Sequence, residues 1–337
     1  MPDNPLVSIC IPTYNRAGMI HRAIESALGQ TYGNIEVIVV DNASTDSTEE
    51  VVRKFKDNRL HFHRNSTNLG LFGNFNKCVE LASGEFIHIL HSDDYIDSDF
   101  TITCIRFFLD HPHVDLTFTS VKIQAGNQET DLSFSDKDEI FIAPEGFRRI
   151  LTNRSFIICP SVMMKRSVYE RHGNYSLEFP YSSDLNQWLK ITRVHDIGFV
   201  RNAWVYYCQG EHSESYHLLF TNATGYLDTL KIYSQLIQSL GKESSSYNTE
   251  LNIMFRRFAL DCLYAGFTRI DTMTGFKPSF FSGTAISSWS MIRSVSIRDL
   301  MTKWALLFIL LSAGCIMVIT PLRLLFKKLL LMKSIQY

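Results

Sequence analysis

Residues 86–94 read FIHILHSDD, a short apolar run that ends abruptly in polar and acidic side chains. The run from Phe86 to Leu90 has the length and β-branched character of a buried strand. Asp93 and Asp94 follow, and adjacent carboxylates at the end of a buried strand repel each other and are costly to desolvate. A hard cation such as Mg²⁺ or Mn²⁺ would remove this cost, because it prefers oxygen ligands and commonly carries substrate phosphates. The stretch therefore predicts a metal site, with a surface turn that caps the next helix as the alternative.

Strands and helices alternate on either side of this stretch. Apolar runs at residues 6–11, 35–40 and 60–63 predict three more strands, and apolar residues at helical spacing predict helices between them. This alternation is typical of a parallel, doubly wound α/β sheet with helices on both faces. In open sheets of this kind, ligands bind at the carboxyl ends of the strands, so the polar residues that follow the strands should converge at one edge. These residues are Thr13, Tyr14, Asp41, Asp93 and Asp94.

The predicted edge has the chemistry of a nucleotide pocket. It offers an aromatic ring to stack on a base, a carboxylate for a base or ribose donor, and a cation site for a diphosphate. A dinucleotide-dependent dehydrogenase is disfavoured, because the first strand is followed by IPTYNRA at residues 11–17 instead of G-x-G-x-x-G. No Walker loop occurs in the sequence either.

Four motifs, in order along the chain, resemble the family 2 glycosyltransferases with the GT-A fold. They are PTYNRA at 12–17, VVDNASTD at 39–46, NLG at 68–70 followed by Asn76, and SDD at 92–94. The likeness is strong over about residues 5–100 and weaker over about residues 140–215. It implies a doubly wound, mostly parallel sheet. It also implies transfer of a sugar from a nucleoside diphosphate sugar with inversion at the anomeric carbon, and Mn²⁺ or Mg²⁺ as cofactor.

The resemblance also implies roles for individual residues. Thr13 and Tyr14 fall where the family contacts the nucleotide, and Asp41 falls where it binds the base. Asp93 takes the position that holds the ribose and the metal, and Asp94 takes that of the metal ligand. The full set expected to bind the sugar nucleotide is Pro12, Thr13, Tyr14, Asn15, Asp41, Asn68, Asn76 and Asp93.

Three residues depart from the family pattern, and one later histidine adds a candidate ligand. His91 replaces the first Asp of the usual Leu-Asp-x-Asp-Asp, Phe75 stands where many members have Arg, and Cys78 where many have Gly. These departures leave the acidic pair intact but affect the donor contacts expected from the Asn-x-Gly region. Related sequences often carry a basic residue or His before Ser in a later loop. His212 could therefore contact the diphosphate or the metal, and a surface histidine is the alternative.

Asp184 is the predicted catalytic base. It opens a helix whose buried face carries Leu185, Trp188 and Leu189, so the alternative is a carboxylate that only stabilises the helix N-terminus. Family members carry an acidic pair at the start of this helix, and because Ser183 replaces the first acid, Asp184 remains. In a single displacement, a base must take the proton of the acceptor hydroxyl on the side of the sugar opposite the departing diphosphate.

The composition limits the class of protein. The 337 residues suffice for one large or two ordinary domains, and the formal net charge of −1 argues against a nucleic-acid partner. Seven scattered cysteines without a Cys-x-x-Cys pair exclude a zinc ribbon and indicate reduced thiols in a cytosolic compartment. We expect no signal peptide, because MPDNP leads straight into a strand. The expected regions are a nucleotide-sugar-binding half at 1–110, an acceptor-side half at 111–220, a helical extension at 221–300 and a membrane-associated segment at 301–337.

The membrane prediction rests on residues 304–320, which are uncharged and reach the lower limit for a spanning helix. Basic residues flank both ends, which conflicts with a simple span because positive charge favours the cytoplasmic side. An in-plane or re-entrant helix pair, with a basic amphipathic anchor at 322–332, is therefore favoured over a single span or a soluble core helix. This predicts a protein at the cytoplasmic face of the inner cell membrane, anchored by its C-terminus, and a polyprenyl-diphosphate-linked saccharide as acceptor.

Together these observations predict an inverting glycosyltransferase. It would move a sugar, most commonly from UDP, to a hydroxyl of a lipid-linked saccharide in the synthesis of O-antigen, capsule or a similar surface polysaccharide. A nucleotidyltransferase that makes the sugar nucleotide is one alternative, but it needs a Gly-rich basic loop where PTYNRA stands. A membrane scaffold without turnover is another, but it should have lost Asp94 or Asp184. The helical extension is expected to pack or self-associate, which allows a homo-oligomer.

Overall fold

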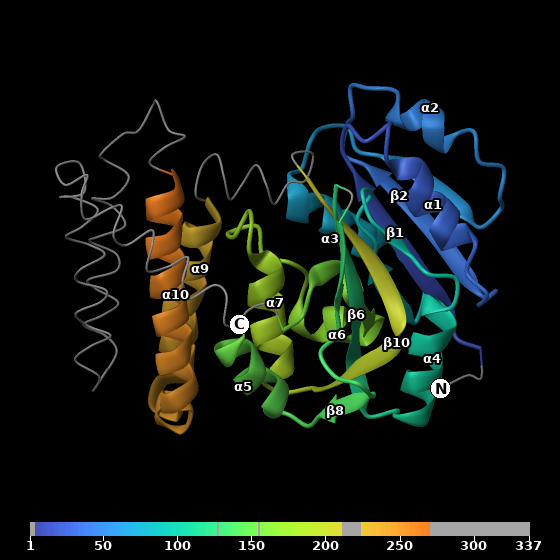
Figure 1. Cartoon of the computed structure of the whole chain (residues 1–337). Helices are drawn as coiled ribbons and strands as arrows, with labels where there is room; N and C mark the ends of the chain where they lie inside the picture. Colours follow the sequence, from blue (N-terminus) through green and yellow to red (C-terminus); the bar gives the residue numbers. More distant parts are fainter. Residues whose placement is uncertain (1–3, 127, 154–155, 211–223, 270–337) are drawn as a thin grey trace. The chain divides into compact units, whose positions relative to one another are not determined.

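The computed structural model describes residues 4–126, 128–153, 156–210 and 224–269 (Figure 1). The chain divides into two compact units, residues 1–228 and 229–337. His212 and the apolar stretch 304–320 lie outside the described residues, and so do the predictions made for them. Among the helices that the structure describes, none is both long enough and apolar enough to cross a membrane.

One sheet forms the framework of the first unit. Its strands follow the order β3-β2-β1-β4-β9-β6-β10-β5, with β7 added beside β6 and β8 beside β10. The strands are β1 (Val7–Thr13), β2 (Ile35–Asp41), β3 (Leu60–Arg64), β4 (Phe86–Ile89), β5 (Tyr95–Ile96), β6 (Val114–Ala125), β7 (Gln128–Leu132), β8 (Glu139–Phe141), β9 (Val162–Lys165) and β10 (Asp196–Gln209).

The sheet is parallel in its first half and mixed in its second. Strands β1 to β4 run parallel, with β1 between β2 and β4. Strand β9 is antiparallel to both β4 and β6, and antiparallel pairs also join β5 and β8 to β10 and β7 to β6. The prediction of a mostly parallel sheet is therefore correct for the first four strands and wrong for the second half. An apolar run reveals a strand, but its direction depends on whether a hairpin or a crossover precedes it.

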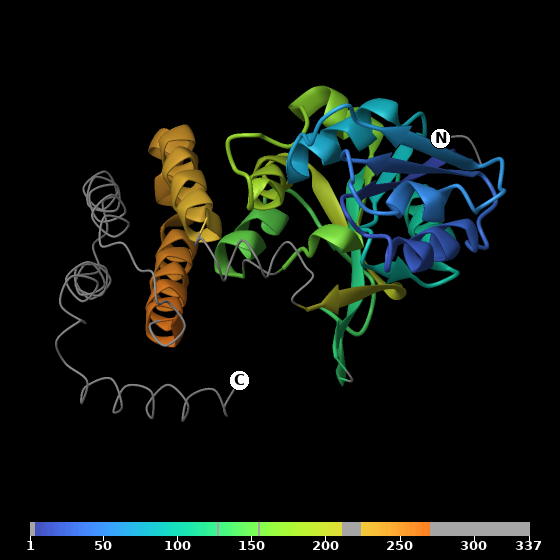
Figure 2. The same ribbon diagram turned by 90° about the horizontal axis from the view of Figure 1, so that it is seen from above.

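Helices cover both faces of the sheet (Figures 1 and 2). Val7, Ile9 and Ile11 of β1 belong to one core cluster with residues of α1 and α4. Cys10 lies on the other face, where its thiol is 3.6 Å from the carbonyl oxygen of Cys78 in α3. Burial on both faces explains why β1 is a continuous apolar run. The helices of this unit are α1 (Ile20–Leu28), α2 (Thr48–Val52), α3 (Leu71–Leu81), α4 (Phe100–Asp110), α5 (Glu145–Thr152), the short η1 (Cys159–Ser161), α6 (Arg166–His172) and α7 (Ser183–Thr192).

The second unit is helical in its described part. It contains most of α9 (Thr224–Leu240), the short η2 (Gly241–Tyr247) and α10 (Asn248–Arg269). Tyr233 of α9 packs against Phe255 and Phe258 of α10, with ring centroids 6.3 and 5.8 Å apart. These contacts account for the apolar residues at helical spacing in this part of the sequence.

His88 is a titratable residue in the middle of β4. Its side chain is completely buried, its Nδ1 lies 2.9 Å from the carbonyl oxygen of Val162, and its ring packs 4.6 Å from that of Phe100. Burial lowers the pKa of His88 to about 4, although the hydrogen bond to Val162 acts in the opposite direction. The native fold therefore contains a neutral imidazole at this position.

We expect this imidazole to make the fold sensitive to acid. In the unfolded chain His88 binds a proton below about pH 6.5, whereas in the folded chain it does so only below about pH 4. The free energy of unfolding therefore falls by about 3 kcal/mol as the pH is lowered from the first value to the second. The measurement is urea unfolding of wild type and His88→Asn from pH 7.5 to 4. As the pH falls, the unfolding free energy of the wild type should decrease more than that of His88→Asn. His88→Leu should show the same shift despite a different stability at neutral pH, and parallel curves for all three proteins would contradict the prediction.

Candidate active site

A pocket of about 570 Å³ opens where the strand ends converge. Its wall is formed by the loop after β1, the start of α3, the loop after β4, η1, the start of α7 and the end of β10. The predicted site residues that line it are Pro12, Thr13, Tyr14, Asn68, Asp93 and Asp184. The predicted residues Asn15, Asp41, Asn76 and Asp94 are not part of the lining surface, and each has a defined place nearby.

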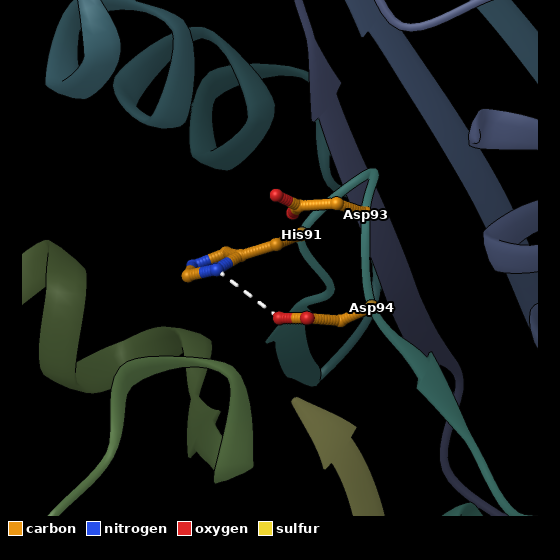
Figure 3. A group of neighbouring side chains, drawn as sticks. All are labelled: His91, Asp93 and Asp94. Carbon is orange, nitrogen blue, oxygen red and sulfur yellow. Dashed lines mark ion pairs between the residues drawn. The ribbon is translucent and has the colours of Figure 1, made fainter. Parts of the chain in front are cut away.

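Asp94 does not line the pocket itself but lies beside Asp93 and His91, which do (Figure 3). Its side chain is completely buried, and its Oδ1 accepts a hydrogen bond of 2.8 Å from the backbone N–H of Cys208. Its Oδ2 lies 3.3 Å from His91 Nδ1 and has no well-aligned hydrogen bond among the described residues. One potential ligand atom from each of His91, Asp93 and Asp94 lies within 4.8 Å of the others. The sequence predicted the two acids but not His91.

The electrostatics of this group combine a buried acid with a basic imidazole. Burial raises the pKa of Asp94 to about 6, the contact with His91 opposes this rise, and the negative charge of Asp93 adds to it. Burial would lower the pKa of His91, yet its interactions with Asp94 and Cys159 outweigh burial, and the pKa lies well above its usual value. A buried carboxylate oxygen without an aligned donor, next to a second acid, is a place where a divalent ion offsets a desolvation cost. The donor set therefore fits a divalent metal.

Arg22 holds the loop that carries Asp93. Its guanidinium donates to the Asp93 carbonyl oxygen at 3.3 Å and lies 2.9 Å from the Cys208 sulfur. It also packs 4.3 Å from the ring centroid of Tyr95, which stacks on Tyr206 at 4.2 Å. These contacts join α1, the loop after β4 and the end of β10. No sequence signal could have revealed them, because Arg22 and Cys208 are 186 positions apart.

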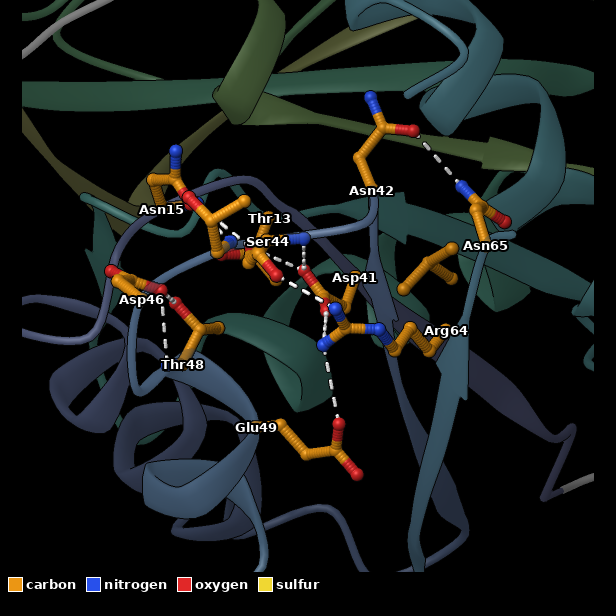
Figure 4. Close-up of polar contacts among 12 residues, drawn as sticks. Thr13, Asn15, Asp41, Asn42, Ser44, Asp46, Thr48, Glu49, Arg64 and Asn65 are labelled. Atoms are coloured by element: carbon orange, nitrogen blue, oxygen red, sulfur yellow. Dashed lines mark hydrogen bonds and ion pairs between the residues drawn. The ribbon is translucent and has the colours of Figure 1, made fainter. Parts of the chain in front are cut away.

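Asp41 stands at the end of β2 with partners of its own (Figure 4). It is completely buried; its Oδ1 accepts from the N–H and hydroxyl of Ser44, and its Oδ2 accepts from Arg64 Nη1 at 3.1 Å. Asn15 supports the same loop, because its backbone N–H donates to Ser44 Oγ and its Oδ1 accepts from the N–H of Thr45, both at 2.8 Å. These bonds hold together the loop that follows β2. Donor binding by Asp41 and Asn15 stays a prediction.

Four asparagines form a network beneath the pocket. Asn42 donates to Asn68 Oδ1 at 2.7 Å, and Asn65 donates to Asn42 Oδ1 at 3.1 Å and to Asn74 Oδ1 at 2.9 Å. Asn74 in turn donates to the Val40 carbonyl oxygen at 3.0 Å. Asn42, Asn68 and Asn74 line the pocket, and only Asn68 was predicted. Asn42 directly follows Asp41 in the VVDNASTD motif, which was a signal that could have been used.

Asn76 faces away from this network. Its Nδ2 donates to the backbone carbonyl oxygen of Tyr175, and its Oδ1 accepts from the N–H of the same residue, both at 2.9 Å. This pair of bonds ties α3 to the loop that precedes α7. The geometry makes Asn76 a structural link between the two sides of the pocket.

We expect Asn76→Ala to lower stability without weakening donor binding. Removal of the amide leaves two backbone groups of Tyr175 without partners, which costs about 1–3 kcal/mol. Thermal unfolding and titration with UDP measure the two effects separately. The matched control is Asn68→Ala, which alters the pocket wall and should weaken UDP binding. Weaker UDP binding by Asn76→Ala at unchanged stability would support the donor role predicted from the sequence.

Asp184 lies in the first turn of α7 and lines the same pocket as Asp93 in the loop after β4. Its Oδ1 accepts from the N–H of Leu185 at 2.8 Å, and its side chain is half-buried. Burial raises the pKa of the Cys159 thiol, contact with His91 lowers it, and the negative charges of Asp184 and Asp94 both raise it. Cys159 and Asp184 both line the pocket.

Comparison with known proteins identifies relatives of this chain. Residues 8–173 match the family model of glycosyl transferase family 2. The UDP-Glc:alpha-D-GlcNAc-diphosphoundecaprenol beta-1,3-glucosyltransferase WfaP of Escherichia coli is 32% identical over 188 residues, which cover 55% of this chain and 70% of that protein. A second Escherichia coli glucosyltransferase with the same enzyme name, WfgD, is 30% identical over 205 residues, which cover 60% of this chain and 76% of that protein. The crystal structure of S. aureus TarS 1-349 in complex with UDP-GlcNAc has a TM-score of 0.70 at 20% identity, covering 92% of this chain and 87% of that chain, which is a likeness of fold.

Proposed function

Because the chain belongs to the family 2 glycosyltransferases, we propose that it transfers a sugar from UDP to a hydroxyl group of a lipid-linked saccharide. The carrying observation is one pocket lined by both Asp93 and Asp184, with the buried Asp94 beside Asp93. The two Escherichia coli relatives are named for transfer from UDP-Glc to a GlcNAc-diphosphoundecaprenol, and the TarS structure holds UDP-GlcNAc. These names support a UDP donor and a polyprenyl-diphosphate acceptor. Such an acceptor places the reaction at a membrane surface, in polysaccharide or O-antigen synthesis.

The donor would lie along the wall formed by β1 and β4. Thr13 and Tyr14 would contact the nucleotide, and the asparagine network at the same pocket would offer amide groups to its ribose and base. Asp94, Asp93 and His91 would hold a divalent ion. When bound, such an ion supplies positive charge to the diphosphate leaving group.

Asp184 would act on the acceptor side. The acceptor hydroxyl oxygen forms a bond to the anomeric carbon while the bond from that carbon to the UDP oxygen breaks, and the hydroxyl proton passes to the Asp184 carboxylate. A base does this within about 2.6–3.2 Å of the hydroxyl, on the face opposite the leaving group. Attack on that face inverts the configuration at the anomeric carbon. In this proposal Asp94 serves the leaving group and Asp184 serves the attacking hydroxyl.

The function is tested by donor binding followed by transfer. We expect UDP-sugars to raise the melting temperature in the presence of Mn²⁺ and to lose this effect in EDTA, with GDP-mannose as the donor control. Incubation with UDP-Glc or UDP-GlcNAc and a GlcNAc-diphospholipid should then release UDP and extend the lipid by one sugar, as measured by mass spectrometry. Absence of both stabilisation and transfer would overturn the proposal. Diphosphate release from UTP and a sugar 1-phosphate would instead indicate a nucleotidyltransferase.

A further inference from the structure

His91 brings a nitrogen atom to a site that would otherwise offer only oxygen. Its Nδ1 lies 3.3 Å from Asp94 Oδ2, and one potential ligand atom of Asp93 lies within 4.8 Å of both. Neighbouring ligands around one ion with bonds of about 2.1 Å are about 3 Å apart, so the separation of Nδ1 and Oδ2 is that of two ligands of the same ion. Figure 3 shows the imidazole ring and the Asp94 carboxylate turned toward each other.

The surroundings of His91 fix this orientation. The centroid of the His91 ring lies 5.6 Å from that of Phe75 in α3, and the side chain of His91 is 24% exposed. Phe75 and His91 are both departures from the family pattern noted in the sequence, in which many members have Arg at the first position and Asp is usual at the second. The phenyl ring offers the imidazole packing but no hydrogen-bond acceptor, so the imidazole nitrogens are left to polar partners such as Asp94.

The carboxylate on the other side is equally fixed. The Cys208 N–H holds Asp94 Oδ1 at 2.8 Å, which leaves Oδ2 directed toward His91. Oδ2 belongs to a completely buried side chain and has no well-aligned hydrogen bond within the described part of the chain. This oxygen and the imidazole nitrogen therefore face each other at 3.3 Å.

We propose that His91 is a metal ligand and that it makes this centre prefer transition metals such as Mn²⁺ and Co²⁺ over Mg²⁺. Imidazole suits transition metals, whereas Mg²⁺ prefers oxygen ligands and retains its water. The inference rests on the proposed function, because it concerns the ion that serves the UDP-sugar. An imidazole at position 91 would give the site a preference among metal ions that a carboxylate there would not provide.

Pulsed EPR of the wild-type protein with Mn²⁺ and UDP is the direct test. We expect a nitrogen coupling from a directly bound imidazole, which changes when the protein is labelled with ¹⁵N-histidine. His91→Asp should abolish this coupling and lower the preference for Mn²⁺ over Mg²⁺ in competition titrations by about tenfold or more. The matched control is His21→Asp, which alters a histidine that is 60% exposed in α1 and should change neither result.

The outcomes separate the two proposals. If Mn²⁺ and UDP bind but no histidine nitrogen couples to the ion, the role of His91 is overturned while the glycosyltransferase site stands. An unchanged metal preference in a folded His91→Asp protein overturns it equally. If the wild-type protein binds neither Mn²⁺ nor UDP-sugars, both proposals fail. The labelled wild-type spectrum shows whether a histidine binds the ion. Loss of the coupling in His91→Asp, or in His91→Gln if His91→Asp does not fold, assigns that histidine as His91.

Discussion

Asp94→Asn is expected to reduce turnover by about 10³-fold, because it removes the buried negative charge of the cation site. The amide has nearly the same shape as the carboxylate, and its oxygen can still accept the N–H of Cys208. The change therefore acts on charge more than on packing. The stability of the metal-free variant should change little, because the variant loses both the desolvation cost that raises the pKa of Asp94 to about 6 and the ion pair with His91.

Two measurements on the same preparations test this combination. Release of UDP in the presence of Mn²⁺ gives the turnover, and thermal unfolding in EDTA gives the stability. The matched control is Asp110→Asn at the exposed end of α4, which should preserve both values. Turnover near the wild-type level would remove the cation site from the mechanism. A large loss of stability would mean that the apparent defect is one of folding.

The first half of the sheet could be predicted because its signals are local. Each parallel strand is a short apolar run that stops at a polar residue, and the connecting helices show their own periodicity. The strand ends meet at one edge as expected, so Thr13, Tyr14 and Asp93 line one pocket. The second half was harder, since β9 pairs with both β4 and β6 in a direction that its sequence does not encode.

The site residues that were missed depend on contacts between distant segments. Arg22 reads as an ordinary residue on the polar face of a helix, and its contact with the Asp93 carbonyl appears only after folding. Asn74 sits within a helix, where an amide side chain gives no sign that it reaches the end of β2. His91 was noticed as a departure from a pattern, but only the 3.3 Å separation from Asp94 Oδ2 makes it a candidate ligand. Motif spacing located the site, and tertiary contacts determine which atoms face it.

Asp184→Asn should separate donor binding from transfer. We expect transfer to the lipid-linked acceptor to fall by about 10²–10⁴-fold, the usual contribution of a general base, while affinity for UDP and Mn²⁺ stays within about twofold. The amide oxygen can still accept the N–H of Leu185, so the first turn of α7 should keep its geometry. Initial rates of acceptor extension and titration with UDP and Mn²⁺ give the two values. The matched control is Glu178→Gln, an exposed acid in the loop before α7, which should behave as wild type.

This contrast distinguishes Asp184 from an acid that only stabilises a helix. A carboxylate in the first turn of a helix contributes about 0.3–1 kcal/mol through the helix dipole, so its loss would lower stability slightly and leave transfer intact. A base that receives the acceptor proton has the opposite signature, with a large loss of transfer and little change in stability. Because Asp94→Asn should weaken metal binding and Asp184→Asn should not, the pair of variants assigns one acid to the leaving group and the other to the attacking hydroxyl. If both variants lost metal binding to the same degree, Asp184 would belong to the cation site, and the acceptor would need another base.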